Sequence, residues 1–194
     1  AKSLSGLKYP ADIDIENVHF AIDDFQQADF SALPALRWRH MERYPLLQGV
    51  VFPKNFDVED ASFTDCYIEF CDFSRLQSPV KWRQIQMARN IVGLIYPAGF
   101  DVENADFSGR DIRHSDFSRV RGLKWKHIED AKSIVGLTYP PDFDMQNADF
   151  SGRDISGSDF SHLPQLRWEW IEDAENIAGI VYPASFDIGR ADFN

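Results

Sequence analysis

A repeat of 43–44 residues constrains this chain more than any other feature. An aromatic residue followed by proline recurs at steps of 43, 44, 43 and 43 residues, at Tyr9-Pro10, Phe52-Pro53, Tyr96-Pro97, Tyr139-Pro140 and Tyr182-Pro183. After each pair a similar block begins, near residues 13, 56, 100, 143 and 186. Self-similarity at one fixed period is typical of repeat architectures, in which each unit packs on its neighbours. We therefore predict a single elongated repeat domain over residues 1–194.

Each complete block has an inner period of five. In the third block the apolar centres are five residues apart, at Val102, Phe107, Ile112 and Phe117. A helix would require a period of 3.6 and a strand a period of 2, so neither explains the block. Four units of five residues predict a square coil, with one inward centre on each side and a tight turn at each corner.

The units ADFSG, RDIRH and SDFSR of the third block resemble the A-(D/N)-(L/F)-x-x unit of pentapeptide-repeat proteins. That resemblance implies a right-handed quadrilateral β-helix with the centre and the preceding small residue inside. Arg110 and Arg153 occupy a position where the family has a small residue. On that side we expect the coil to bulge, or these residues to point outward.

The segments between blocks have a different pattern. Apolar residues three apart form stripes that begin at a tryptophan, such as Trp82, Ile85 and Ala88. This spacing predicts one short helix per repeat, with its tryptophan packed in the core. Neighbouring helices need 8–10 Å, whereas coils rise by ~4.8 Å, so we predict two coils per repeat. The predicted fold class is a β-solenoid with interleaved α-helices, an α/β repeat protein.

Charge and cysteine content restrict the partners and the compartment. The chain has 31 acidic and 20 basic residues and a net charge of −11. We therefore expect no direct binding to nucleic acid or to an anionic membrane, and no apolar stretch is long enough to span one. Cys66 and Cys71 lie in the small-residue position of successive units, so we expect free core thiols. A reducing compartment is favoured: bacterial cytoplasm, or host cytosol for a secreted effector.

No motif for catalysis, a cofactor or a metal is present. The five histidines occupy different repeat positions, and only His40 and His127 come close to sharing one. The aspartates that precede the centres form columns, which predict turn hydrogen bonds or else an acidic stripe for a basic partner. Basic residues form columns before the tryptophans. The candidate partner-binding residues are therefore Arg110, Arg153, Asp57, Asp101, Asp144, Lys81, Lys124 and Arg167.

These observations predict a non-enzymatic scaffold for protein–protein interaction. Pentapeptide-like domains also resemble modules of bacterial secreted effectors, and both ends of this chain fall inside a repeat. We therefore expect a module of a longer protein, or end-to-end oligomers. The alternative, implied by the family resemblance and the acidic charge, is a DNA mimic that acts on a topoisomerase such as gyrase.

Overall fold

The computed structural model describes residues 5–17, 20, 25–187 and 189. The chain divides into two compact units, Ala1–Phe100 (unit 1) and Asp101–Asn194 (unit 2), and each has its own stack of turns. The boundary falls at the start of the third sequence block. Other blocks begin in the same way inside a unit, so the repeat alone does not predict where the boundary lies. The expectation of a single domain over 1–194 stays a prediction.

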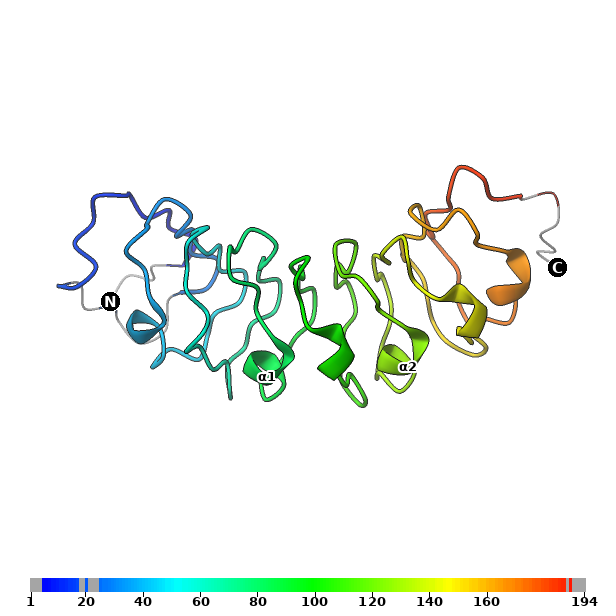
Figure 1. Cartoon of the computed structure of the whole chain (residues 1–194), viewed down its shortest axis with the longest axis horizontal. Coiled ribbons are helices and arrows are strands. Elements are labelled where there is room, and N and C mark those ends of the chain that lie inside the picture. Colours follow the sequence, from blue (N-terminus) through cyan, green and yellow to red (C-terminus); the bar gives the residue numbers. More distant parts are fainter. Residues whose placement is uncertain (1–4, 18–19, 21–24, 188, 190–194) are drawn as a thin grey trace. The chain divides into compact units, whose positions relative to one another are not determined.

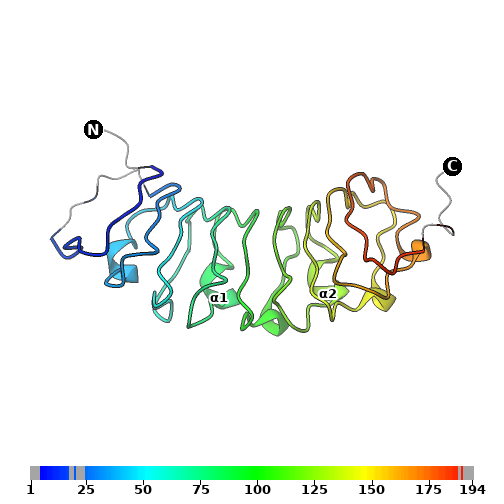
Figure 2. The ribbon, with the colours of Figure 1, turned by 90° about the horizontal axis from the view of Figure 1, so that it is seen from above.

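Within each unit the chain winds through successive turns that lie side by side (Figures 1 and 2). Isolated parallel bridges connect each turn to the next, between residues 21 to 23 apart. Unit 1 contains the series Leu46, Tyr67 and Asn90, and unit 2 contains Thr138 bridged to Asp159. Since one bridge step is about half of the sequence period, each repeat forms two turns. The prediction of two coils per repeat is confirmed.

The predicted fold class, a β-solenoid or β-helix with interleaved α-helices, is wrong. The described residues contain no β-strand and no sheet, only single-residue bridges. The reason is that a β-turn closes at almost every unit of five: the Phe63 carbonyl accepts the Cys66 N–H at 3.0 Å. A β-turn occupies four residues, so each side of a winding retains one residue that can pair with the neighbouring winding. A ladder therefore never extends into a strand.

The helices are also shorter than predicted. Two α-helices of one turn each are described, α1 (Trp82–Ile85) and α2 (Trp125–Ile128). Four 3₁₀ turns accompany them: η1 (Trp38–His40), η2 (Val102–Asn104), η3 (Met145–Asn147) and η4 (Trp168–Trp170). The rest of each apolar stripe lies in β-turns. In the stripe that begins at Trp82, for example, the Ala88 N–H donates to the Ile85 carbonyl at 2.9 Å. None of the helices among the described residues could cross a membrane.

Aromatic side chains fill the interior of the turns. In unit 2 the Tyr139 ring stacks on Phe160 with centroids 4.7 Å apart. In unit 1 the Trp38 ring meets Phe63 edge-on at 4.9 Å. The other three tryptophans that begin the stripes are buried, which confirms the predicted packing of these residues: Trp82, Trp125 and Trp168.

Candidate protein interface

The short helices of each unit lie along one edge of its turns (Figure 1). In unit 2 the residues that precede them alternate in charge, in the order Asp101 (η2), Lys124 (α2), Asp144 (η3) and Arg167 (η4). In unit 1, Arg37 precedes η1 and Lys81 precedes α1, with Asp57 in the turn between them. We call the four residues of unit 2, and likewise the three residues of unit 1, the helix edge of that unit. Together the two edges contain six of the eight residues predicted as a partner-binding surface.

The basic residues of the helix edge do not cap their helices. In α1 the Lys81 N–H donates to Oε1 of Gln84 at 2.7 Å, and in α2 the Lys124 N–H donates to Nδ1 of His127 at 3.0 Å. The third helical residue thus supplies the capping group, as in one half of a capping box. The ammonium groups of Lys81 and Lys124 are not needed for this bond. Capping of the helix therefore does not explain why these two positions are basic.

The capping residues form a column that sequence analysis only partly detected. His40, Gln84 and His127 lie three residues after the basic position of their repeats, and each accepts its N–H. Burial is the main cause that lowers the pKa of His127, and the neighbouring charges of Lys126 and Lys124 lower it further. The imidazole therefore stays neutral and keeps Nδ1 available as an acceptor.

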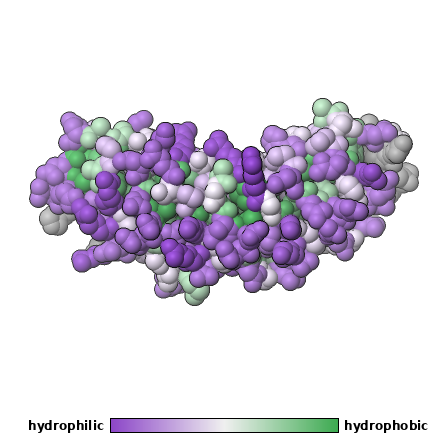
Figure 3. Space-filling view, in the orientation of Figure 1, coloured by the Kyte–Doolittle hydropathy of each residue, from purple (hydrophilic) through white to green (hydrophobic). Residues whose placement is uncertain are grey.

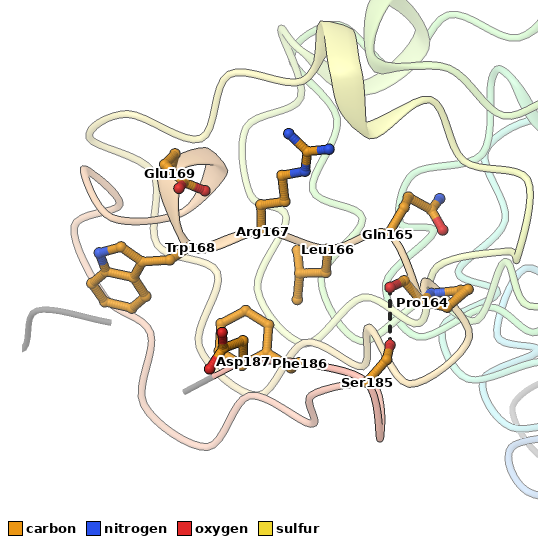
Figure 4. Close-up of a pocket in the computed structure, with 9 residues that line it drawn as sticks. All are labelled: Pro164, Gln165, Leu166, Arg167, Trp168, Glu169, Ser185, Phe186 and Asp187. Carbon is orange, nitrogen blue, oxygen red and sulfur yellow. Dashed lines mark hydrogen bonds between the residues drawn. The ribbon is translucent and has the colours of Figure 1, made fainter. Parts of the chain in front are cut away.

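Open hollows lie between the helix edge and the following turn. In unit 2 a hollow of about 450 Å³ separates residues 164–169 from 185–187. Figure 4 shows the Leu166 side chain directed toward Phe186 and Asp187, with Trp168 to one side and the Arg167 guanidinium directed the opposite way from Phe186. Unit 1 has a hollow of about 340 Å³ at the same place in its first repeat, lined by Arg37 and Asp57. A hollow beside charged groups thus recurs at a corresponding place in both units.

The aspartates mainly stabilise turns, as the first of the two interpretations predicted. Their Oδ1 atoms accept the N–H two residues later at 2.8–3.2 Å, at Asp29, Asp57, Asp72, Asp106, Asp111, Asp116, Asp149, Asp154, Asp159 and Asp187. The hydrogen bonds from Ser108 lower the pKa of Asp106. These hydrogen bonds hold the carboxylates in fixed orientations at the turns.

The predicted aspartate columns are not continuous. In unit 1 the bridged series reads Asp29, Val51, Asp72 and Ile95, because the second turn of each repeat places a β-branched residue between two aspartates. Like charges are therefore two turns apart, about 9.6 Å for a rise of ~4.8 Å per turn. The acidic stripe is interrupted by apolar residues.

Arg110 and Arg153, the other two predicted residues, do not precede a helix and so do not belong to a helix edge. The Arg153 guanidinium reaches across to the preceding turn, where it donates to the carbonyls of Glu129 at 2.5 Å and Ala131 at 2.7 Å. These two bonds hold the chain that leaves α2. Arg110 is half-buried, and its carbonyl accepts the Lys132 N–H at 2.8 Å.

Metal-ligating side chains and cysteines were the remaining candidates for chemistry in the part of the chain that is described. No group of three His, Cys, Asp or Glu side chains there could hold a metal ion. Cys66 and Cys71 carry free thiols and are buried, as predicted. Burial raises the pKa of Cys66 to about 11 and that of Cys71 to about 12, so neither is a thiolate at neutral pH.

Comparison with known proteins leaves the chain without an assigned family. No protein-family model matches it, and no curated protein matches it in sequence. A solved structure that it resembles is that of QnrB1, a plasmid-mediated fluoroquinolone resistance protein, with 14% sequence identity over 96% of this chain and 86% of that one. The TM-score is 0.21, and this likeness supports no argument about fold or function.

Proposed function

We propose that this protein is a non-enzymatic scaffold and that the helix edge of each unit binds a partner protein. The observation that carries the proposal is the alternation of charge there, with Lys124 between Asp101 and Asp144 in unit 2. The exposed Lys81, Lys124 and Arg167 stand at helix starts where they add no cap. Such a row of both signs fits a partner with complementary rows, since electrostatic complementarity sets register and specificity.

The test compares capture of cellular proteins by the wild type and by a variant with Lys81→Glu, Lys124→Glu and Arg167→Glu. We expect the wild type to retain a partner that the triple variant loses, and the partner to elute as salt is raised. Lys132→Glu is the matched control, because Lys132 is exposed and lies off the helix edge. Equal capture by all three proteins, or no capture at all, would contradict the proposal.

The acidic net charge favours a second candidate, mimicry of DNA toward a topoisomerase. The interrupted aspartate series and the basic residues of the helix edge count against it, because a DNA mimic needs regular rows of negative charge. A gyrase supercoiling assay distinguishes the two: inhibition that persists in the triple variant would support mimicry, and no inhibition would leave the scaffold. Membership of a longer secreted effector stays a prediction.

A further inference from the structure

One loop of unit 1 departs from the repeat. In the first repeat two residues separate Leu33 from Leu36, and the third and fourth repeats also have two residues at this place. In the second repeat three residues separate Leu76 from Val80, which makes this repeat 44 residues long, whereas the others have 43. Insertions in repeat proteins map to loops that often belong to the binding face. The loop at residues 77–79 is therefore the place where a function specific to this repeat is expected.

The loop at residues 77–79 also packs differently on the next turn. In the other three complete repeats a side chain of the next turn forms a hydrogen bond to the loop, in the pairs Asn55 with Pro34, Asp142 with Gly122 and Ser185 with Pro164. In the second repeat this position is Gly99, where a β-carbon would lie 2.9 Å from Cγ of Pro79. Pro79 thus fills the space of the bonding side chain, so the insertion and the glycine belong together.

The inserted loop forms one wall of a hollow of about 290 Å³ in unit 1. The other walls are Val58 and Glu59 of the preceding turn and Lys81, Arg83 and Gln84 at α1. We call this the Arg83 hollow. The Gln84 amide connects two walls, because its Oε1 accepts the Lys81 N–H at 2.7 Å and its Nε2 donates to the Val58 carbonyl. The hollow is therefore held in shape before a ligand binds, which lowers the entropy cost of binding.

The charges of the Arg83 hollow distinguish it from the hollows beside Arg37 and Arg167. Lys81 and Arg83 line it with one acidic residue, Glu59, so its lining has a net charge of +1. The linings at Arg37 and Arg167 each contain one more acidic than basic residue. Neither Lys81 nor Arg83 forms an ion pair with a described residue, and both are exposed. Two unpaired cations in one hollow of a chain with a net charge of −11 are available to bind an anion.

We infer that the Arg83 hollow binds a glutamate or aspartate side chain of the partner protein, an inference that rests on the proposed scaffold function. The Arg83 guanidinium presents parallel N–H groups that fit a carboxylate, and Lys81 adds a second cation. The net charge favours a carboxylate over a phosphate, because one carboxylate neutralises it whereas a phosphate of nearly two charges would also face Glu59. The side of the molecule visible in Figure 3 is largely hydrophilic, with apolar residues only in small patches, so a charged segment fits it better than an apolar one.

The experiment measures binding of a fluorescein-labelled hexaglutamate peptide to the full chain by fluorescence polarisation, with hexaglutamine as the uncharged control. The wild type should bind hexaglutamate, although both molecules are acidic, and binding should weaken as salt is raised. Arg83→Glu should raise the dissociation constant roughly tenfold or more. Arg43→Glu is the matched control and should leave binding unchanged, because Arg43 is an exposed arginine of unit 1 outside this hollow.

A second variant tests the loop without a change of charge. Deletion of Pro79 together with Gly99→Asn copies the first repeat, where the loop has two residues and Asn55 bonds to it. Circular dichroism should show that this variant stays folded, because the first repeat folds with the same loop. It should bind hexaglutamate roughly tenfold less tightly although Lys81 and Arg83 are retained, since one wall of the hollow is lost.

A wild type that does not bind hexaglutamate overturns the inference, and so does an equal loss of binding in Arg43→Glu and Arg83→Glu. Displacement of the peptide by inorganic phosphate at concentrations where acetate has no effect overturns it as well, because the hollow is then a phosphate site. Arg83 is unchanged in the triple variant that tests the scaffold, so the two failures are distinguishable. Capture of a partner without hexaglutamate binding rejects only the Arg83 hollow, and hexaglutamate binding without a captured partner supports the hollow and rejects only the scaffold.

Discussion

The aromatic ring of Phe70 lies directly against the backbone of Gly93 in the next turn. A β-carbon on Gly93 would lie 2.3 Å from the nearest ring carbon, far inside van der Waals contact. Both residues have positive φ, 59° and 68°. His114 and Gly136 repeat this relationship in unit 2, with 2.4 Å to the imidazole. A ring at one left-handed corner therefore leaves no room for a β-carbon at the corner of the next turn.

This relationship predicts that Gly93→Ala is more costly than an ordinary left-handed glycine replacement. The substitution combines about 1–2 kcal/mol of backbone strain with about 1–3 kcal/mol from the clash with Phe70. Gly157→Ala is the control, because its φ is 66° and its β-carbon would meet nothing nearer than 3.8 Å. Urea denaturation measures both losses. If Phe70→Gly does not rescue Gly93→Ala, the clash is not the cause.

The buried hydroxyl of Tyr139 gives a prediction of the opposite sign. Among the described residues it has no hydrogen-bond partner, and burial raises its pKa. Phe52 occupies the same repeat position and stacks on Phe73 without a hydroxyl. Tyr139→Phe should therefore leave the free energy of unfolding unchanged or raise it by about 1 kcal/mol.

The control for Tyr139→Phe is a tyrosine whose hydroxyl is bonded. The Tyr44 hydroxyl donates to the Phe20 carbonyl at 2.9 Å, so Tyr44→Phe should cost about 1 kcal/mol. Thermal denaturation of both variants gives the comparison. A Tyr139→Phe variant that loses as much stability as Tyr44→Phe would show that the Tyr139 hydroxyl is bonded in solution.

The sequence predicted those features that depend on burial, and missed those that depend on how backbone groups pair. The five-residue period identified the buried centres and the positions of Cys66 and Cys71. The three-residue spacing of the apolar stripe could not distinguish a helix from a β-turn, because Ile85 and Ala88 are three residues apart in either case. The contact of Phe70 with Gly93 was also missed, although glycines at steps of 43–44 residues, at Gly49, Gly93, Gly136 and Gly179, were its signal.

The candidate surface shows the same division. Columns of charge were visible in the sequence, so most residues of the helix edge could be identified. Arg153 was grouped with them because a guanidinium resembles an exposed binding group in any sequence. Its two carbonyl partners belong to residues 22 and 24 positions earlier, and that pairing depends on how the turns stack.

Arg153 should therefore act on stability. Loss of its bonds to the carbonyls of Glu129 and Ala131 in Arg153→Ala should reduce the free energy of unfolding by about 1–3 kcal/mol. The Arg153→Lys variant retains the charge but lacks the planar fork that reaches both carbonyls, so it should lose an intermediate amount. Chemical denaturation measures both variants. Loss of partner capture at full stability would instead assign Arg153 to binding.

The two cysteines should be protected from thiol reagents in the native state. With the pKa values raised to about 11 and about 12, almost no thiolate exists at pH 8, and both side chains are buried. Ellman's reagent should label them slowly in buffer and rapidly in denaturant. Cys71 should be the slower of the two, as single Cys→Ala variants would show. Rapid native labelling of both would contradict their place in the core.

His127 makes stability depend on pH in one direction. Because its folded pKa is lowered, the neutral form is favoured in the folded state, and its contribution is complete above the unfolded pKa of about 6.5. As pH falls below that value the unfolded chain gains a proton that the folded chain resists, so stability is lost until pH passes the folded pKa. The charges facing His127 are Lys124, Lys126 and Glu103.

The chain itself provides the matched variant, since Gln84 makes the same cap in α1 without a titratable group. His127→Gln should therefore lose less stability than the wild type between pH 8 and pH 5, and the difference is the part of the loss that protonation of His127 causes. Urea denaturation over this pH range measures the two curves. Parallel curves would show that protonation of His127 does not break the cap to which Lys124 donates.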